Sequence, residues 1–372
     1  MIKYVRRKNM RFLIVLWLFA VCCNEAKFHE LRVDNPEYIP NTTFAGYENL
    51  SSPKFKSLKE KYQLDTIFHG ETNELKRILL LRNWIRQIIP INDPGPHPGD
   101  GTCESILDHA LKGAGYHCGH FMVVQNAIMN AYGYVTRCLG AGPGGIDSSD
   151  GHHGMNEIWL NSLHKWFLSD AKYNSHFEKN GIPLSALEVR AEYLKNKAAD
   201  IIRAKGVART PVEFDEEYKI SKEHFARTYT WLEWDKYNDR YTPDSSIEGD
   251  RGILNMYNDE YFKTHTWIWD GKPHWAYNTK FMNLVSDREA IEWTPNTIAS
   301  KIVIENNKAK IELRSTTPNF KTYQMKELPD GNWKDVPGSV ETNLKKERNE
   351  IVFRAINLED VAGPEHKVII AN

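Results

Sequence analysis

The sequence has no excess of either charge, and it lacks the cysteine and histidine spacings most typical of zinc sites. Among 372 residues, 48 Lys and Arg balance 49 Asp and Glu, which gives a formal net charge of -1. Proteins that bind nucleic acid usually carry a basic excess or stripe, so nothing in this balance favours such a partner. Neither a CxxC pair nor an HExxH motif occurs. We therefore expect no metal, no cofactor and no nucleic acid.

Long apolar runs are also scarce, and the one near the start is short. It extends from Phe12 to Val21 and follows a basic stretch at residues 3–11. Such a run is about half the length of a membrane-spanning helix. A charged and then apolar start is typical of a signal peptide, whereas an internal core helix is the alternative. We assign residues 1–23 to a signal peptide and expect an exported protein.

The residues after this run suggest a lipid anchor. Ala20-Val21-Cys22-Cys23 loosely resembles the lipobox of bacterial lipoproteins, with Val21 in place of the usual small residue. Lipid attachment at Cys22 or Cys23 would place the protein at the cell envelope, and a stable anchor needs a second acyl chain. Simple secretion, including release into a periplasm, is the alternative.

Cysteine is rare in the remaining chain, where only Cys103, Cys118 and Cys138 occur. An odd number in an exported protein leaves at least one thiol free or intermolecular. A disulfide between Cys103 and Cys138 would leave Cys118 as that thiol. Nothing in the sequence fixes the distance between the two, so their pairing stays open.

What the sequence does contain is a clear succession of helices and strands up to about residue 205. Apolar residues at helical spacing predict a helix over residues 72–89, which a Pro- and Gly-rich loop follows. A capping box at Ser185 predicts a helix that runs to about Lys205. Between them we expect two further helices and then three strands, over residues 104–112, a stretch from Cys118 to about Gly133, and residues 134–139, 155–160 and 165–169.

The pattern changes near residue 290. Before it lies a charged, tryptophan-rich segment whose sequence shows no clear pattern of helices or strands. After Pro295, short alternating runs separated by turn residues predict a small β-sandwich, with strands over residues 301–305, 310–314, 321–325, 350–355 and 367–371. We therefore predict one domain over residues 24–290 and a β-sandwich domain over residues 291–372.

Cys118 begins one of these helices, and a helix N-terminus favours the thiolate, the nucleophilic form of cysteine. The strands predicted over residues 155–160 and 165–169 should form a hairpin. If Leu160 pairs with Lys165, Met155 lies opposite Asp170, and His153 shares the face of Met155. His153 and Asp170 are then diagonal neighbours whose side chains can meet. Cys118, His153 and Asp170 are our candidate nucleophile, base and orienting carboxylate.

These pieces together carry a resemblance to a known family. They are Tyr116-His117-Cys118 at a helix start, Gly133 to Arg137 after that helix, His153 four residues before Glu157, and Trp166 four before Asp170. In this order they resemble the transglutaminase-like superfamily, over about residues 72–175. We expect a bacterial exported member with an α+β fold, a papain-like core and a C-terminal immunoglobulin-like β-sandwich.

The resemblance implies a Cys-His-Asp triad at Cys118, His153 and Asp170 and acyl transfer from amides. We expect an exported cysteine-dependent enzyme that hydrolyses an amide of a protein, peptide or glycopeptide through a thioester. The alternative is a noncatalytic cell-envelope protein that binds a glycan or peptide on the same scaffold. The later tryptophans would then form a binding platform, although such residues are more often core or lid packing.

The histidines near Cys118 allow other interpretations. His152 stands beside His153 and competes for the role of base, and the spacing to Glu157 favours His153 by analogy with the family. His117, His120 and His152 crowd the same region, so a zinc site with Cys118 is the other alternative. We interpret Glu157 and Trp166 as structural residues.

Overall fold

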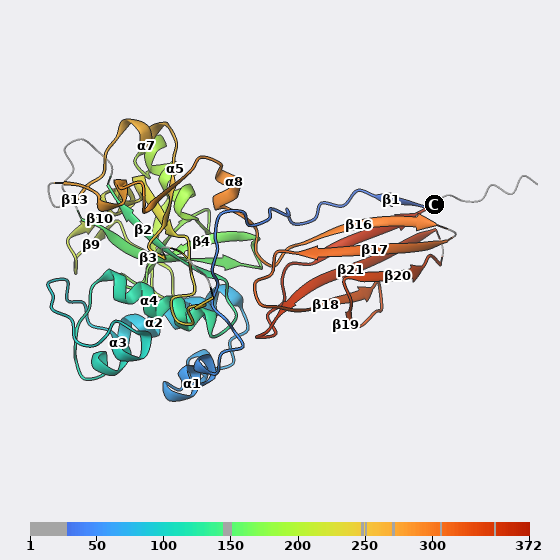
Figure 1. The fold of residues 1–372 in the computed structure, drawn as a ribbon, viewed down its shortest axis with the longest axis horizontal. Coiled ribbons are helices and arrows are strands. Elements are labelled where there is room, and N and C mark those ends of the chain that lie inside the picture. Colours follow the sequence, from blue (N-terminus) through green and yellow to red (C-terminus); the bar gives the residue numbers. More distant parts are fainter. Residues whose placement is uncertain are drawn as a thin grey trace, which may run out of the picture.

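The computed structural model describes residues 28–143, 151–246, 249, 251–269, 272–305, 307–345 and 347–372. The predicted signal peptide and lipid-attachment cysteines lie outside these residues. Within them no helix is both long and apolar enough to span a membrane. The fold is mixed α+β, as predicted, with several antiparallel sheets. Figure 1 shows helices around a sheet at one end of the molecule and a purely β part at the other.

A six-stranded sheet forms the centre of the larger part. Its neighbours are antiparallel except for one parallel pair, β12 with β15. In spatial order the strands are β15 (Met282–Val285), β12 (Leu254–Tyr257), β11 (Trp231–Asp235), β2 (Thr136–Gly142), β3 (His153–Leu160) and β4 (Lys165–Ser169).

Helices cover both faces of this sheet. Successive side chains of its strands point to opposite faces, and each face packs against helices in its own apolar core. Ile158 and Phe167 point to the first core, with helices α1 (Pro53–Lys61), α2 (Glu74–Ile88), α3 (Cys103–Ala110) and α4 (Cys118–Asn130). Trp159 and Leu168 point to the second core, with α5 (Ala186–Asn196) and α6 (Lys222–Arg227). The predicted helices over residues 72–89 and 104–112 correspond to α2 and α3.

The helix predicted from Ser185 to about Lys205 is too long. Its capping box is present, but α5 ends at Asn196 because Lys197 has a φ of 57° and its N–H bonds back to the carbonyl of Tyr193. The residues that follow instead form β7 (Ile202–Lys205). This strand lies in a second sheet with β6 (Ile182–Pro183), β5 (Ser175–Lys179) and β8 (Thr210–Pro211).

The β part consists of two antiparallel sheets that share one apolar core. One sheet contains β16 (Ile298–Glu305), β17 (Lys308–Ser315) and β20 (Ser339–Asn343). The other contains β1 (His29–Leu31), β22 (His366–Ala371), β21 (Arg348–Asn357), β18 (Phe320–Glu327) and β19 (Lys334–Val336). The five predicted strands are present, whereas the short and largely polar β19 and β20 were missed.

Strand β1 was not predicted. Leu31 pairs with Ile369, so a segment near the start of the chain completes the edge of the C-terminal sheet (Figure 1). The predicted division at residue 290 did not anticipate this pairing, because a three-residue strand has no readable period.

Shorter elements complete the described chain. They are η1 (Leu64–Phe68), β9 (Phe214–Asp215), β10 (Ile220–Ser221), η2 (Thr228–Thr230), α7 (Glu260–Thr264), β13 (Ile268–Trp269), β14 (Lys272–Pro273), η3 (Trp275–Tyr277) and α8 (Arg288–Ile291).

Cys103 and Cys138 do not form a disulfide. Both are buried free thiols in the structure. Cys103 begins α3 within the first core, whereas Cys138 lies on β2, where its sulfur accepts a hydrogen bond from the Asn156 amide at 3.7 Å. All three cysteines of the described chain are therefore free.

Candidate active site

Helix α4 brings Cys118 to the edge of the central sheet. His117 is its N-cap, and Nδ1 of His117 accepts the N–H of Gly119 at 3.1 Å. Cys118 thus lies in the first turn, where backbone N–H groups lack intrahelical partners. Gly154 of β3 faces Gly119, so the start of the helix lies close over the start of the strand. Farther along α4, Gln125 donates to Ser169 Oγ at 2.6 Å and fixes the helix against β4.

The hairpin has the predicted register. Leu160 pairs with Lys165 and Asn156 with Ser169, so Met155 lies opposite Asp170. His153 and Asp170 therefore share the face opposite α4. The Nε2 atom of His153 lies 2.6 Å from Oδ2 of Asp170. The predicted contact between these two side chains is confirmed.

The carboxylate of Asp170 is held from several sides. Its Oδ1 accepts the N–H of Tyr173 at 3.1 Å, and its backbone pairs with Ser175. Buried Arg82 of α2 donates to the carbonyl of Ser175 at 3.0 Å and supports this turn. Burial by itself raises the pKa of Asp170, but His153, the Tyr173 N–H and Arg203 outweigh it and hold that pKa below its usual value.

Cys118 joins this pair. Burial by itself raises the pKa of the Cys118 thiol, but hydrogen bonds with His117, His152 and His153 outweigh burial and lower that pKa far below its usual value. Burial likewise opposes charge on His153, yet Asp170 and Cys118 raise the pKa of His153 to about 9. The three residues predicted from the sequence therefore meet, and their surroundings favour a thiolate beside an imidazolium.

A second imidazole–carboxylate pair flanks the same thiol. His152 Nε2 lies 3.1 Å from Glu233 Oε1. Burial by itself lowers the pKa of His152, but Cys118 and Glu233 outweigh burial and raise that pKa to about 9. The Cys118 thiol also approaches the backbone carbonyl of His152 at 3.9 Å. Glu233 was not predicted as a site residue, because it lies on β11 in the tryptophan-rich segment, far from His152 in sequence.

Aromatic rings cover this second pair. The ring of His152 stacks on Trp267 at a centroid distance of 5.5 Å, and Trp267 stacks on His274 at 4.1 Å. Trp231, Trp234 and Trp267 are all buried, so most of these tryptophans pack the interior, as expected. Trp275, at 48% exposure, is the exception among the tryptophan side chains described there.

A glycine makes room for Trp267. A Cβ atom placed on Gly142 of β2 would overlap the buried indole of Trp267. We expect Gly142→Ala to lower the free energy of unfolding by about 1–3 kcal/mol, because an added Cβ would lie 2.0 Å from the buried indole and force the ring or the strand to shift. Urea unfolding followed by tryptophan fluorescence measures this. Gly151→Ala, where an added Cβ meets none of the described residues within 4 Å, is the matched control, and an equal effect of both variants would contradict the packing argument.

A cavity of about 580 Å³ opens onto Cys118 and His153. Its wall includes Lys172, whose ammonium pairs with Asp93 at 2.6 Å, and Arg227 of α6. The aromatic ring of Phe225 lies 5.9 Å from that of His153 and forms part of the same wall. The thiol therefore faces a space large enough for part of a peptide or another amide.

Two groups of side chains in the described chain have the composition and spacing of metal ligands. One is His152, Glu233 and His274, and the other is His97, His117 and His120. The zinc alternative drawn from the sequence grouped His152 with His117 and His120. The structure instead places His97 beside those two, because the Pro- and Gly-rich loop returns to the start of α4, which no sequence spacing reveals.

Comparison with known proteins adds a distant similarity. No family model and no curated protein matches the sequence. Among solved structures, red sea bream transglutaminase is similar over 78% of this chain and 67% of its own, with 9% identical residues and a TM-score of 0.22. A similarity at this level identifies neither an activity nor a substrate.

Proposed function

We propose that this protein is an exported, cysteine-dependent acyl-transfer enzyme with a transglutaminase-like, papain-like core and an immunoglobulin-like C-terminal sandwich. The observation that carries the proposal is the 2.6 Å contact between His153 and Asp170 beside the thiol of Cys118. A nucleophile, a base and a group that orients the base are the parts that acyl transfer through a thioester requires.

We give each of the three residues one role in the proposed reaction. Because Nε2 of His153 faces Asp170, Nδ1 is the nitrogen left for the thiol. His153 already holds the proton of Cys118, and the thiolate attacks an amide carbonyl to give a tetrahedral adduct. His153 then returns the proton to the leaving amine, and a thioester remains. Asp170 orients the imidazole and stabilises its charged form.

Water then resolves the thioester. His153 removes a proton from a water molecule, and the oxygen of the water bonds to the carbonyl carbon. The C–S bond then breaks, which releases a carboxylic acid and restores Cys118. We favour hydrolysis over crosslinking because water requires no second binding site. The proposed substrate is a protein, peptide or glycopeptide outside the cytoplasm or at the cell envelope.

A labelling experiment tests the nucleophile. Among Cys103, Cys118 and Cys138 of the chelator-treated protein, we expect a chloroacetamide probe to modify only Cys118 rapidly at neutral pH, as peptide mapping should show. Cys103 and Cys138 are the internal controls, because both are fully buried and burial raises their pKa. Slow labelling of Cys118, at the rate of an unactivated thiol, would contradict the proposal and support the noncatalytic binding protein.

A product assay tests the choice of acyl acceptor. A casein digest is incubated with the protein and a fluorescent primary amine, and released ammonia, new N-termini and bound amine are measured together. Because both acceptors follow release of the same leaving group, hydrolysis equals the released ammonia and new N-termini minus the bound amine, and we expect this difference to exceed amine incorporation. The reverse ratio would overturn hydrolysis while leaving the thioester chemistry in place.

A further inference from the structure

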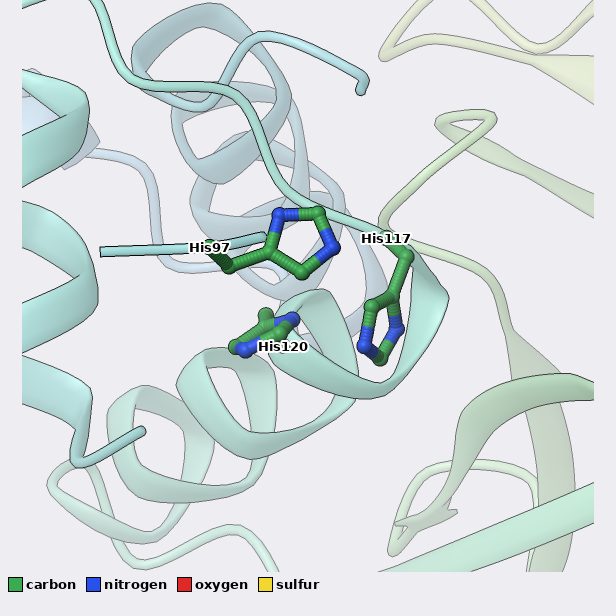
Figure 2. Close-up of side chains that lie close together, drawn as sticks. All are labelled: His97, His117 and His120. Carbon is green, nitrogen blue, oxygen red and sulfur yellow. The ribbon is translucent and has the colours of Figure 1, made fainter. Parts of the chain in front are cut away.

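Three histidines gather on the side of α4 next to Cys118, outside the triad. His117 is the N-cap of the helix, His120 lies in its first turn, and His97 reaches them from the loop between α2 and α3 (Figure 2). The ring centroids of His97 lie 4.8 Å from those of both His117 and His120, which are 4.2 Å from each other. One nitrogen from each ring lies within 4.8 Å of the others.

The loop that carries His97 is held in place. The hydroxyl of buried Tyr116 donates to the carbonyl of Pro98 at 2.9 Å, and Ile91 pairs with Tyr116 in a short bridge. The ring of Tyr116 also stacks on His97 at 5.6 Å. The three imidazoles thus approach one another on two anchored segments of the fold.

The hydrogen bonds of these rings leave nitrogen atoms for a ligand. Nδ1 of His97 faces the carbonyl of Gly115 at 3.1 Å and must donate to it, so Nε2 keeps its lone pair. A backbone carbonyl in this position is a common orienting partner of metal-bound histidine. Nδ1 of His120 is shielded from solvent and has no hydrogen-bond partner in the described part of the chain.

His117 has a different arrangement. Its Nδ1 accepts the N–H of Gly119, so the hydrogen of the neutral ring lies on Nε2. A metal at His117 therefore displaces the Nε2 proton or replaces the hydrogen bond of Gly119. Three imidazoles packed this closely repel one another when charged, whereas neutral rings suit a cation.

We propose that His97, His117 and His120 form a binding site for one divalent transition metal ion, with Zn²⁺ as the best fit. Imidazole nitrogens are common ligands of Zn²⁺, and three protein ligands leave a fourth position open in tetrahedral coordination. Nitrogens bound at about 2.0–2.1 Å in a tetrahedron lie about 3.4 Å apart. The ligand nitrogens must therefore move closer together when the metal binds, from their present separation of up to 4.8 Å.

The metal site does not depend on the proposed acyl transfer. Neither His153 nor Asp170 belongs to it, and binding can be measured without any substrate. His117 links the two sites, since it contacts Cys118 as well as the other two histidines.

Calorimetry with metal alone tests the site. Untagged full-length protein is treated with chelator, dialysed and titrated with ZnCl₂, and cobalt is used in parallel for absorption spectra. We expect one ion per chain and a cobalt spectrum typical of nitrogen ligands in tetrahedral geometry. His97→Ala and His120→Gln should each weaken zinc binding at least tenfold, with circular dichroism unchanged.

Two control variants make the result decisive. His109→Gln alters a histidine in α3 whose ring lies near the same loop but outside the cluster, and it should bind zinc like the unaltered protein. His274→Gln alters the second group of potential ligands and should have no effect. Failure to bind zinc, or loss of binding in His274→Gln but not in His97→Ala, would overturn the proposal.

Discussion

Replacing His153 by alanine is expected to reduce amide hydrolysis by about 10²–10⁴-fold, the range that general acid–base catalysis contributes. The cause is the loss of the only imidazole that pairs with Asp170 among the described residues, at 2.6 Å. The casein-digest assay on chelator-treated protein measures the change. Cys118→Ala should abolish turnover altogether, since no thioester can form.

His152→Ala is the matched comparison for His153→Ala. Both histidines contact Cys118 and both pair with a carboxylate, but the contact of His152 with Glu233 is longer, at 3.1 Å. We expect His152→Ala to lower turnover less than tenfold. If His152→Ala were the more damaging variant, the base would be His152, and the assignment by spacing to Glu157 would be wrong.

The second large effect is on stability. Glu157→Ala is expected to lower the free energy of unfolding by about 3–5 kcal/mol, the cost of breaking a buried ion pair on one side. Both members of the pair, Glu157 and Arg137, are about 1% exposed. The carboxylate accepts from Arg137 at 2.6 and 2.9 Å, from the indole of Trp234 at 2.7 Å and from the N–H of Ala186 at 2.7 Å. Its removal leaves the guanidinium uncompensated inside the second core.

Urea unfolding of purified protein measures the Glu157→Ala effect. The double variant Arg137→Met/Glu157→Leu should recover part of the lost stability, because two apolar side chains leave no buried charge. Lys310→Ala removes a surface contact with Glu312 and should leave the urea midpoint nearly unchanged. An equal loss in Glu157→Ala and Lys310→Ala would contradict the argument from burial.

This ion pair also explains why two residues of the sequence pattern are structural. Arg137 lies over the ring of Trp166 at 4.0 Å, and the indole of Trp166 donates to the carbonyl of Trp293 at 2.8 Å. Glu157 and Trp166 thereby connect the hairpin to the segment that leads into the β part. They fix the strands that carry His153 and Asp170 without touching the thiol.

The hairpin was the part of the site most open to prediction from sequence. Side chains alternate along a strand, so a single pairing, Leu160 with Lys165, decides which residues share a face. The start of α4 at Cys118 was likewise visible in the helical period that follows it. Both inferences use contacts between residues that are near in sequence.

Long-range contacts were not open to the same reasoning. Glu233 reaches His152 from a strand 81 positions away, and β1 pairs with β22 across almost the whole chain. The wrong length of α5 has a local cause, since Lys197 takes a left-handed conformation that its sequence does not require. The cluster with His97 depends on a loop of irregular backbone, which no period describes.

The sequence alone therefore determined the α+β composition, the helix start at Cys118 and the face shared by His153 and Asp170. Burial of one face of a helix or strand imposes a periodic pattern of apolar residues, and that pattern can be recognised within a short stretch of sequence. Only the tertiary structure decided which carboxylate pairs with His152 and which histidines gather beside α4. These contacts arise where separate elements pack together, and packing depends on the shapes of all the surfaces involved and not on spacing along the chain.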